Sequence, residues 1–155
     1  MIVVVNTSPL IALDRIGQLD ILRQLFGRVV RPQSVVDELM AGRHLYGGSS
    51  LLFDAPWMET REDPGEVIFR RELGAGETAA IVLARKMNAD LLLLDDLAAR
   101  RVATELELRI SGTLGVLFAA SRRGYINDLE KTLSDLSSSG FRISDQMRKS
   151  ILSAP

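Results

Sequence analysis

Residues 89–96 read ADLLLLDD, and this stretch decides the fold class because four leucines stand between charged residues. A short, uninterrupted apolar run is typical of a strand that is buried on both faces of a sheet. Such a strand delivers Asp95 and Asp96 at its carboxyl end. The stretch therefore predicts a parallel sheet that is covered by helices, with acidic side chains at one edge.

A second apolar run lies near the start of the chain. Residues 3–11 read VVVNTSPLI, so a β-branched run ends at Asn6 and is followed by Pro9, which suits the first turn of a helix. In open α/β sheets, ligands bind in the crevice at the carboxyl ends of the strands. We therefore expect Asn6 to share that crevice with Asp95 and Asp96.

Helices and strands alternate along the rest of the chain, which implies right-handed βαβ units and a three-layer α/β fold with four or five parallel strands. Turn signals predict a surface loop over 43–50. The other predicted elements are a helix through 10–13 that breaks near Gly17 and resumes over 21–25, a strand over 28–31, a helix over 34–40, an edge strand over 57–60, a polar helix between Pro64 and Gly74, a helix that follows Gly76, a helix over 98–105, a strand over 109–110 and a helix through 116–120.

Composition limits the class of protein. A chain of 155 residues that is 46% hydrophobic can form one domain over 1–155. A helical tail is expected over 128–155, with a Ser-Gly hinge at 137–140, and its last helix can pack on its own sheet or on a second subunit. The chain has no cysteine, which excludes disulfides and thiolate zinc sites.

Localisation and charge are less specific. No run approaches the roughly 20 apolar residues that a membrane span requires, so we expect a cytoplasmic protein without a membrane partner. The net charge of −1 creates no overall field for nucleic acid. The arginine pair Arg100 and Arg101 suits phosphate, although solvated helix faces also use arginine.

Two carboxylates on helices, Glu38 and Glu77, can point into the same crevice as the strand-end residues. An all-oxygen cluster of this kind suits Mg²⁺ or Mn²⁺ and lacks the His or Cys ligands that zinc prefers. Each acid also has a structural interpretation. Asp95 or Asp96 can cap the next helix, Glu77 can complement a helix dipole, and Glu38 can be an ordinary solvated residue.

Five segments in this order resemble a PIN-domain protein of the VapC-like kind, and the chain is similar to a little-characterised PIN-like subgroup. The segments are VVVNTSPLI, VVDELM, LGAGETAAIVLA, LLLLDDLAARRVA and SGTLGVL, and the tail GFRISDQMRKSIL extends the likeness over nearly the whole chain. The resemblance implies a ribonuclease that uses Mg²⁺ or Mn²⁺, often the toxin of a toxin–antitoxin pair, and usually a homodimer.

The resemblance also implies the site. The positions that match the four acids of the family are Asn6, Glu38, Glu77 and Asp96, of which the last three would be catalytic and all four would hold the metal. Asp95 can substitute for Asp96 or assist it. Ser8 would support the metal site, and Arg100 and Arg101 would steer the RNA backbone.

This sequence departs from the family pattern at Asn6, where an acid is expected. An amide keeps the shape and an oxygen ligand but removes one negative charge, so affinity for a cation should fall. A PIN-fold module that binds RNA or a partner protein without cutting is therefore the alternative. A receiver-type phosphoryl-transfer domain also gathers acids at strand ends, but it needs a lysine at a late strand end. The only lysines are Lys86, Lys131 and Lys149, and none is predicted at a strand end, which disfavours the receiver-type domain.

Overall fold

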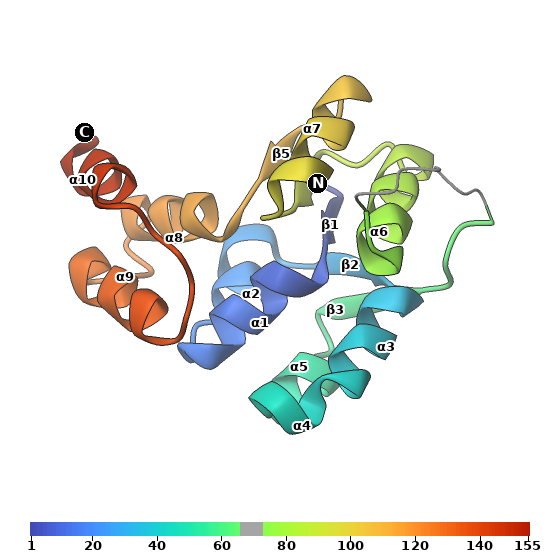
Figure 1. The fold of residues 1–155 in the computed structure, drawn as a ribbon, viewed down its shortest axis with the longest axis horizontal. Helices are drawn as coiled ribbons and strands as arrows, with labels where there is room; N and C mark the ends of the chain where they lie inside the picture. The colour runs from blue at the N-terminus through green and yellow to red at the C-terminus, as the bar shows by residue number, and fades with distance from the viewer. Residues whose placement is uncertain (66–72) are drawn as a thin grey trace.

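The computed structural model describes residues 1–65 and 73–155. Most of the polar helix that the sequence predicts between Pro64 and Gly74 lies outside these residues. The rest of the chain folds as a central sheet with helices on both faces, as the alternating pattern predicts (Figure 1).

The sheet has five parallel strands in the order β3-β2-β1-β4-β5. The first strand lies in the centre of the sheet, and its residues are buried on both faces. The chain places further strands on both sides of it. Val5 pairs with Leu93 across the β1 and β4 pair, so these two strands end side by side. The strands are β1 (Val3–Val5), β2 (Val29–Pro32), β3 (Met58–Arg61), β4 (Leu91–Leu93) and β5 (Ile110–Ser111).

The helices confirm most of the boundaries that capping and glycine signals predict. Gly27 ends the second helix with a positive φ of 75°, a conformation that glycine adopts at little cost. The helices are α1 (Thr7–Arg15), α2 (Ile21–Phe26), α3 (Gln33–Ala41), α4 (Arg43–Tyr46), α5 (Ser50–Asp54), α6 (Ala75–Lys86), α7 (Leu97–Glu105), α8 (Thr113–Arg122), α9 (Leu129–Ser138) and α10 (Asp145–Ser153).

Strand alternation divides the core into two clusters, one on each face of the sheet. Val3 and Val5 join a cluster with α1, α2, α3, α5, α8 and α9, whereas Val4 joins a cluster with α6 and α7. Neighbouring residues of a strand point to opposite faces, so a strand of consecutive valines supplies both clusters. The result is the three-layer arrangement that the apolar runs predict.

The surface loop predicted over 43–50 is wrong, because this segment contains α4 and the start of α5. Leu52 on α5 is fully buried in the core. The buried Arg31 donates hydrogen bonds to the carbonyl oxygens of Leu52, at 2.6 Å, and Phe53, at 3.3 Å. These contacts join residues about twenty positions apart, and they outweigh the local turn signals.

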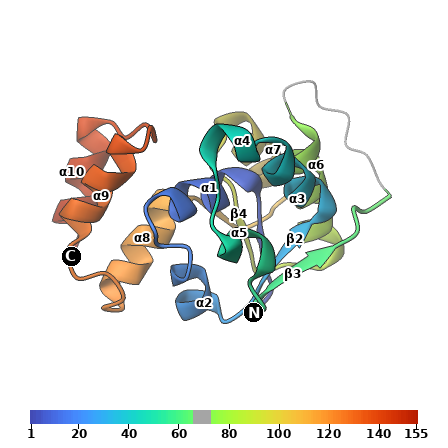
Figure 2. The same ribbon diagram turned by 90° about the horizontal axis from the view of Figure 1, so that it is seen from below.

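The tail packs on its own chain through α9. Leu133 and Leu136 are fully buried in the cluster that contains α8. The last helix lies against α9 at the red end of the molecule, beyond α8, and has no buried residue (Figure 2). Within the described residues, we find no helix with the length and apolar character needed to cross a membrane.

Candidate functional site

The ends of β1 and β4 bring the predicted site residues to one edge of the sheet. The backbone N–H of Asn6 donates to the carbonyl of Leu93 at 3.1 Å, which extends the β1 and β4 pairing by one residue. Directly after these strands, the chain turns into α1 and α7. Asn6 and Asp96 are the N-cap residues of these two helices.

Glu38, from α3, is fixed by two other helices. Its Oε2 accepts a hydrogen bond from the Thr7 hydroxyl at 2.8 Å, and its Oε1 accepts one from the Gly76 N–H at 2.9 Å. A side chain at Gly76 would force the Glu38 carboxylate to move, because its Cβ would lie 2.9 Å from Cδ of Glu38. Glu38 therefore lies where the N-terminal ends of α1 and α6 meet.

Glu77 and Asp96 complete a group of three carboxylates, which we call the acidic cluster (Glu38, Glu77 and Asp96). Partial burial raises the pKa of Glu77, and the nearby carboxylates of Asp96 and Glu38 raise this pKa further. A hydrogen bond from the Gly74 N–H to Glu77, at 2.9 Å, acts in the opposite direction. The three acids come from separate elements, so the fold holds like charges within electrostatic reach of one another.

The structural interpretations of Glu77 and Asp96 also hold, whereas Glu38 is exposed but, unlike an ordinary solvated residue, is held by two hydrogen bonds. Glu77 stabilises the start of α6, because its Oε1 accepts a hydrogen bond from the N–H of the N-cap residue Gly74. Asp96 caps α7 by accepting a hydrogen bond from the Ala99 N–H at 3.0 Å. Capping explains why each helix begins where it does, but it does not explain why the two caps and Glu38 lie together.

Asp95 takes a different direction from Asp96, as strand alternation predicts. Its Oδ1 accepts from the Thr113 N–H at 2.8 Å, and its Oδ2 accepts from the Thr113 hydroxyl at 2.7 Å. Both contacts hold the start of α8 against the end of β4. A role for Asp95 as a ligand in the acidic cluster therefore remains a prediction.

Asn6 has a feature that fits a cation. Its side chain is 3% exposed, and its Oδ1 has no hydrogen-bond partner among the described residues. Most buried polar atoms in proteins are paired, so an unpaired amide oxygen beside strand-end acids needs an explanation. An oxygen donor of this type is a suitable ligand for Mg²⁺ or Mn²⁺.

The acidic cluster alone is not a closed metal cage. Across 1–65 and 73–155, no three His, Asp or Glu side chains are grouped closely enough to hold an ion by themselves. Magnesium usually keeps several waters and binds through one or two carboxylates. A cation at this edge would therefore need water molecules among its ligands.

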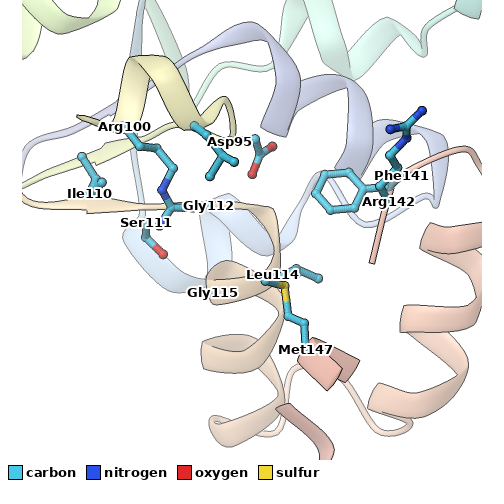
Figure 3. Close-up of a pocket in the computed structure, with 11 residues that line it drawn as sticks. Asp95, Arg100, Ile110, Ser111, Gly112, Leu114, Gly115, Phe141, Arg142 and Met147 are labelled. Carbon is cyan, nitrogen blue, oxygen red and sulfur yellow. The ribbon is translucent and has the colours of Figure 1, made fainter. Parts of the chain in front are cut away.

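The supporting residues that the sequence predicts line surface hollows that do not include the residues of the acidic cluster. Ser8 is exposed and lines a hollow of about 210 Å³ together with Asp95. Arg100 lines a larger hollow of about 540 Å³ (Figure 3). Arg101, on the same helix, is exposed and lines an adjoining surface hollow with Thr104 and Arg100.

Sequence reasoning missed Thr7 and Gly76, which position Glu38. Thr7 lies directly after Asn6, and Gly76 directly precedes Glu77, so both are adjacent to predicted site residues. Their partner, however, is more than 30 positions away in the chain. The available signal was that Thr7 and Gly76 are adjacent in the sequence to predicted site residues. Their contacts with Glu38 could be identified only from the folded structure.

Comparisons with known proteins agree with this architecture. A family model described as a PIN domain matches residues 2–154. Among solved structures, the chain is similar to a PilT N-terminus domain protein from the hyperthermophilic archaeon Sulfolobus solfataricus P2, with a TM-score of 0.53 and 16% identity over 93% of this chain and 98% of that one. Curated proteins gave no significant match.

Proposed function

Because this chain belongs to the PIN-domain family, we propose that it is a ribonuclease that depends on Mg²⁺ or Mn²⁺ and is weakened by Asn6. PIN domains are generally nucleases and generally use divalent metal ions. The finer part of the proposal is a VapC-type endoribonuclease, the toxin of a toxin–antitoxin pair.

One observation carries the proposal, namely that the fold gathers the acidic cluster around a half-buried Glu77, whose pKa is raised first by burial and then by the nearby carboxylates of Asp96 and Glu38. Like charges brought together without a cation must either repel or take up a proton. If these acids served only as helix caps, nothing would explain why the fold accepts this electrostatic cost. A divalent cation would offset the repulsion and would also accept the unpaired Oδ1 of Asn6 as a ligand.

The cation would be held by Asn6, Glu38, Glu77 and Asp96. When bound, it orients a water molecule and offsets the charge that develops on the phosphate. Hydrogen bonds fix the ligand orientation, since Thr7 and the Gly76 N–H both hold Glu38. Asp96 is held by the Ala99 N–H, so its other oxygen is positioned without reorganisation of the helix.

The decisive experiment is cleavage of labelled RNA by the full chain in Mn²⁺, with EDTA as the blank. Asp96→Asn should lower the rate at least about a hundredfold, because it removes a charged ligand while an asparagine can still cap α7. Asp128→Asn is the matched control, since Asp128 caps α9 by accepting from the Lys131 N–H at 3.0 Å, far from the site. Equal activity in the two variants would contradict the proposal.

The alternative is a PIN-fold module that binds RNA or a partner without cutting, and the observation in its favour is the missing acid at Asn6. The two functions differ in their response to metal. A ligand that binds the folded state raises the melting temperature, so Mn²⁺ should stabilise the nuclease. A module without a cation site should show no such shift and no cleavage at any metal concentration.

A homodimer and an antitoxin partner are part of the proposal. Because α8 covers the apolar face of α9 within the same chain, that face no longer argues for a second subunit. The exposed Met147 and Leu152 on α10 remain as apolar contacts for one. Light scattering at high micromolar concentration should give twice the 17.1 kDa of one chain. A single-chain mass would contradict the dimer.

A further inference from the structure

Two hollows meet beneath the segment that joins α9 to α10. The larger, of about 540 Å³, and the smaller, of about 210 Å³, share Asp95 and Phe141. We call the combined depression the tail groove. It runs from Ser8, two residues after Asn6 in the chain, past Asp95, the residue before Asp96, to the start of α8.

The walls of the tail groove combine apolar and charged groups. Figure 3 shows the ring of Phe141 pointing toward Asp95, with Leu114 and Met147 below. The Arg100 side chain extends from α7 toward Gly112, where a Cβ would lie 2.9 Å from its Nη1. Within the part of the chain that the structure describes, the Arg100 guanidinium has no ion-pair partner.

We propose that the tail groove binds one unpaired nucleotide of the RNA, with its base on the ring of Phe141 and its phosphate on Arg100. This inference rests on the proposed function. Arg100 lies one helical turn after Asp96 on α7, which suits a phosphate that neighbours the scissile one. The carboxylate of Asp95 lies between them and keeps lone pairs that can accept an amino group of the base.

The combination of groups favours an unpaired nucleotide over other ligands. Bases that are not paired can leave the stack and lie on an aromatic side chain, whereas bases within a duplex cannot. The volume of the larger hollow is in the range of small-molecule sites. A purely apolar peptide would leave the Arg100 guanidinium without a counter-charge.

The test measures binding, without cleavage, of a fluorescein-labelled single-stranded RNA hexamer to the full chain in EDTA. Phe141→Leu should weaken binding about fivefold or more, the lower end of the loss for one stacked base. Arg100→Gln should weaken binding and reduce the magnitude of the salt slope by about 0.7, the value for one phosphate contact on a single strand. The melting temperature of Arg100→Gln should stay close to that of the wild type, whereas that of Phe141→Leu should fall because the half-buried ring packs against the core, so binding is measured well below both melting temperatures.

Matched controls use the same changes elsewhere. Phe118→Leu removes a ring from α8 that lies 6.0 Å from the Arg122 guanidinium, and Arg85→Gln removes an exposed charge from the last turn of α6. Neither residue lines the tail groove. If Phe141→Leu and Arg100→Gln bind the hexamer as tightly as these controls, the inference is overturned. A duplex bound as tightly as the single strand, or an apolar peptide that displaces the hexamer with unchanged affinity in Arg100→Gln, would also overturn it.

The binding assay separates this inference from the proposed nuclease activity. Binding that depends on Phe141 and Arg100 without any cleavage in Mn²⁺ would support the tail groove and contradict the nuclease. Cleavage that is unchanged in Phe141→Leu and Arg100→Gln would support the nuclease and contradict the tail groove. Photocrosslinking of 4-thiouridine in the hexamer, mapped by mass spectrometry, should identify Phe141 or its chain neighbours. Crosslinks confined to other surfaces would refute the assignment.

Discussion

Restoring a carboxylate at Asn6 is the sharpest test of a cation site. Asn6→Asp adds a negative charge at nearly constant volume, at a side chain that is 3% exposed. Even in a water-like dielectric, a unit charge about 4 Å from a divalent ion gains about 2 kcal/mol, which corresponds to about thirtyfold tighter binding. The partly buried crevice should increase this gain, so thirtyfold is a lower value.

Thermal unfolding with Mn²⁺ measures this gain. At an Mn²⁺ concentration equal to the wild-type Kd, the metal stabilises the wild type by about 0.4 kcal/mol and the variant by about 2 kcal/mol. For a chain of this size, 1 kcal/mol changes Tm by about 2–4 °C, so the metal-induced shift should be about 3–6 °C larger in the variant. RNase activity in Mn²⁺ should rise in parallel.

In the metal-free protein, the same substitution should change thermal stability in the opposite direction. Without Mn²⁺, Asn6→Asp should melt below the wild type near pH 7, because a new carboxylate repels the acidic cluster. Asn127→Asp, at an exposed position between α8 and α9, makes the same change of charge away from the site. A metal-induced shift in Asn6→Asp that equals the shifts of wild type and Asn127→Asp would refute the cation site.

Three further predictions concern the same architecture. The raised pKa of Glu77 means that the contribution of this residue to metal-free stability is fully present below the ordinary pKa of glutamate and is lost as pH rises through the raised value; Glu77→Gln should remove this contribution to the difference between urea unfolding at pH 4 and pH 8. Gly76→Ala should displace the Glu38 carboxylate and lower metal-dependent cleavage, despite the usual helix preference for alanine. Arg31→Met should lower the free energy of unfolding by about 2–4 kcal/mol, because the carbonyls of Leu52 and Phe53, one in a buried and one in a part-buried hydrogen bond, lose their donor.

The sheet was predictable because its strands are short apolar runs with charged or turn residues at both ends. The run at 91–94 and the run at 3–5 mark adjacent parallel strands, and the acids at their ends follow from that placement. The segment 43–50 was not predictable. Its local glycines and serines indicate a loop, whereas the helix of α5 is stabilised by Leu52 in the core and by Arg31 from another strand.

The candidate site was predictable in composition but not in detail. Strand-end logic brings Asn6 and Asp96 to one edge, and it separates Asp95 from Asp96. It does not reveal that Thr113 donates a hydrogen bond to Asp95 or that Thr7 donates one to Glu38, because these contacts span 18 and 31 positions of the chain. Hydrogen bonds of that range depend on how the helices pack.

The side chain of Asn6, the amide at the end of the first strand, lacks a hydrogen bond that this position normally makes. This missing contact gives a physical reason for an amide there. Asparagine at an N-cap usually accepts a hydrogen bond from the first turn of its helix, as Asp96 and Asp128 do in this chain. Asn6 occupies the N-cap of α1 with an extended backbone but makes no such bond, and its Oδ1 has no partner within the described residues. A buried acceptor left unpaired costs about 1–3 kcal/mol. A cation would remove that cost and the repulsion within the acidic cluster at once, whereas a purely structural role accounts for neither.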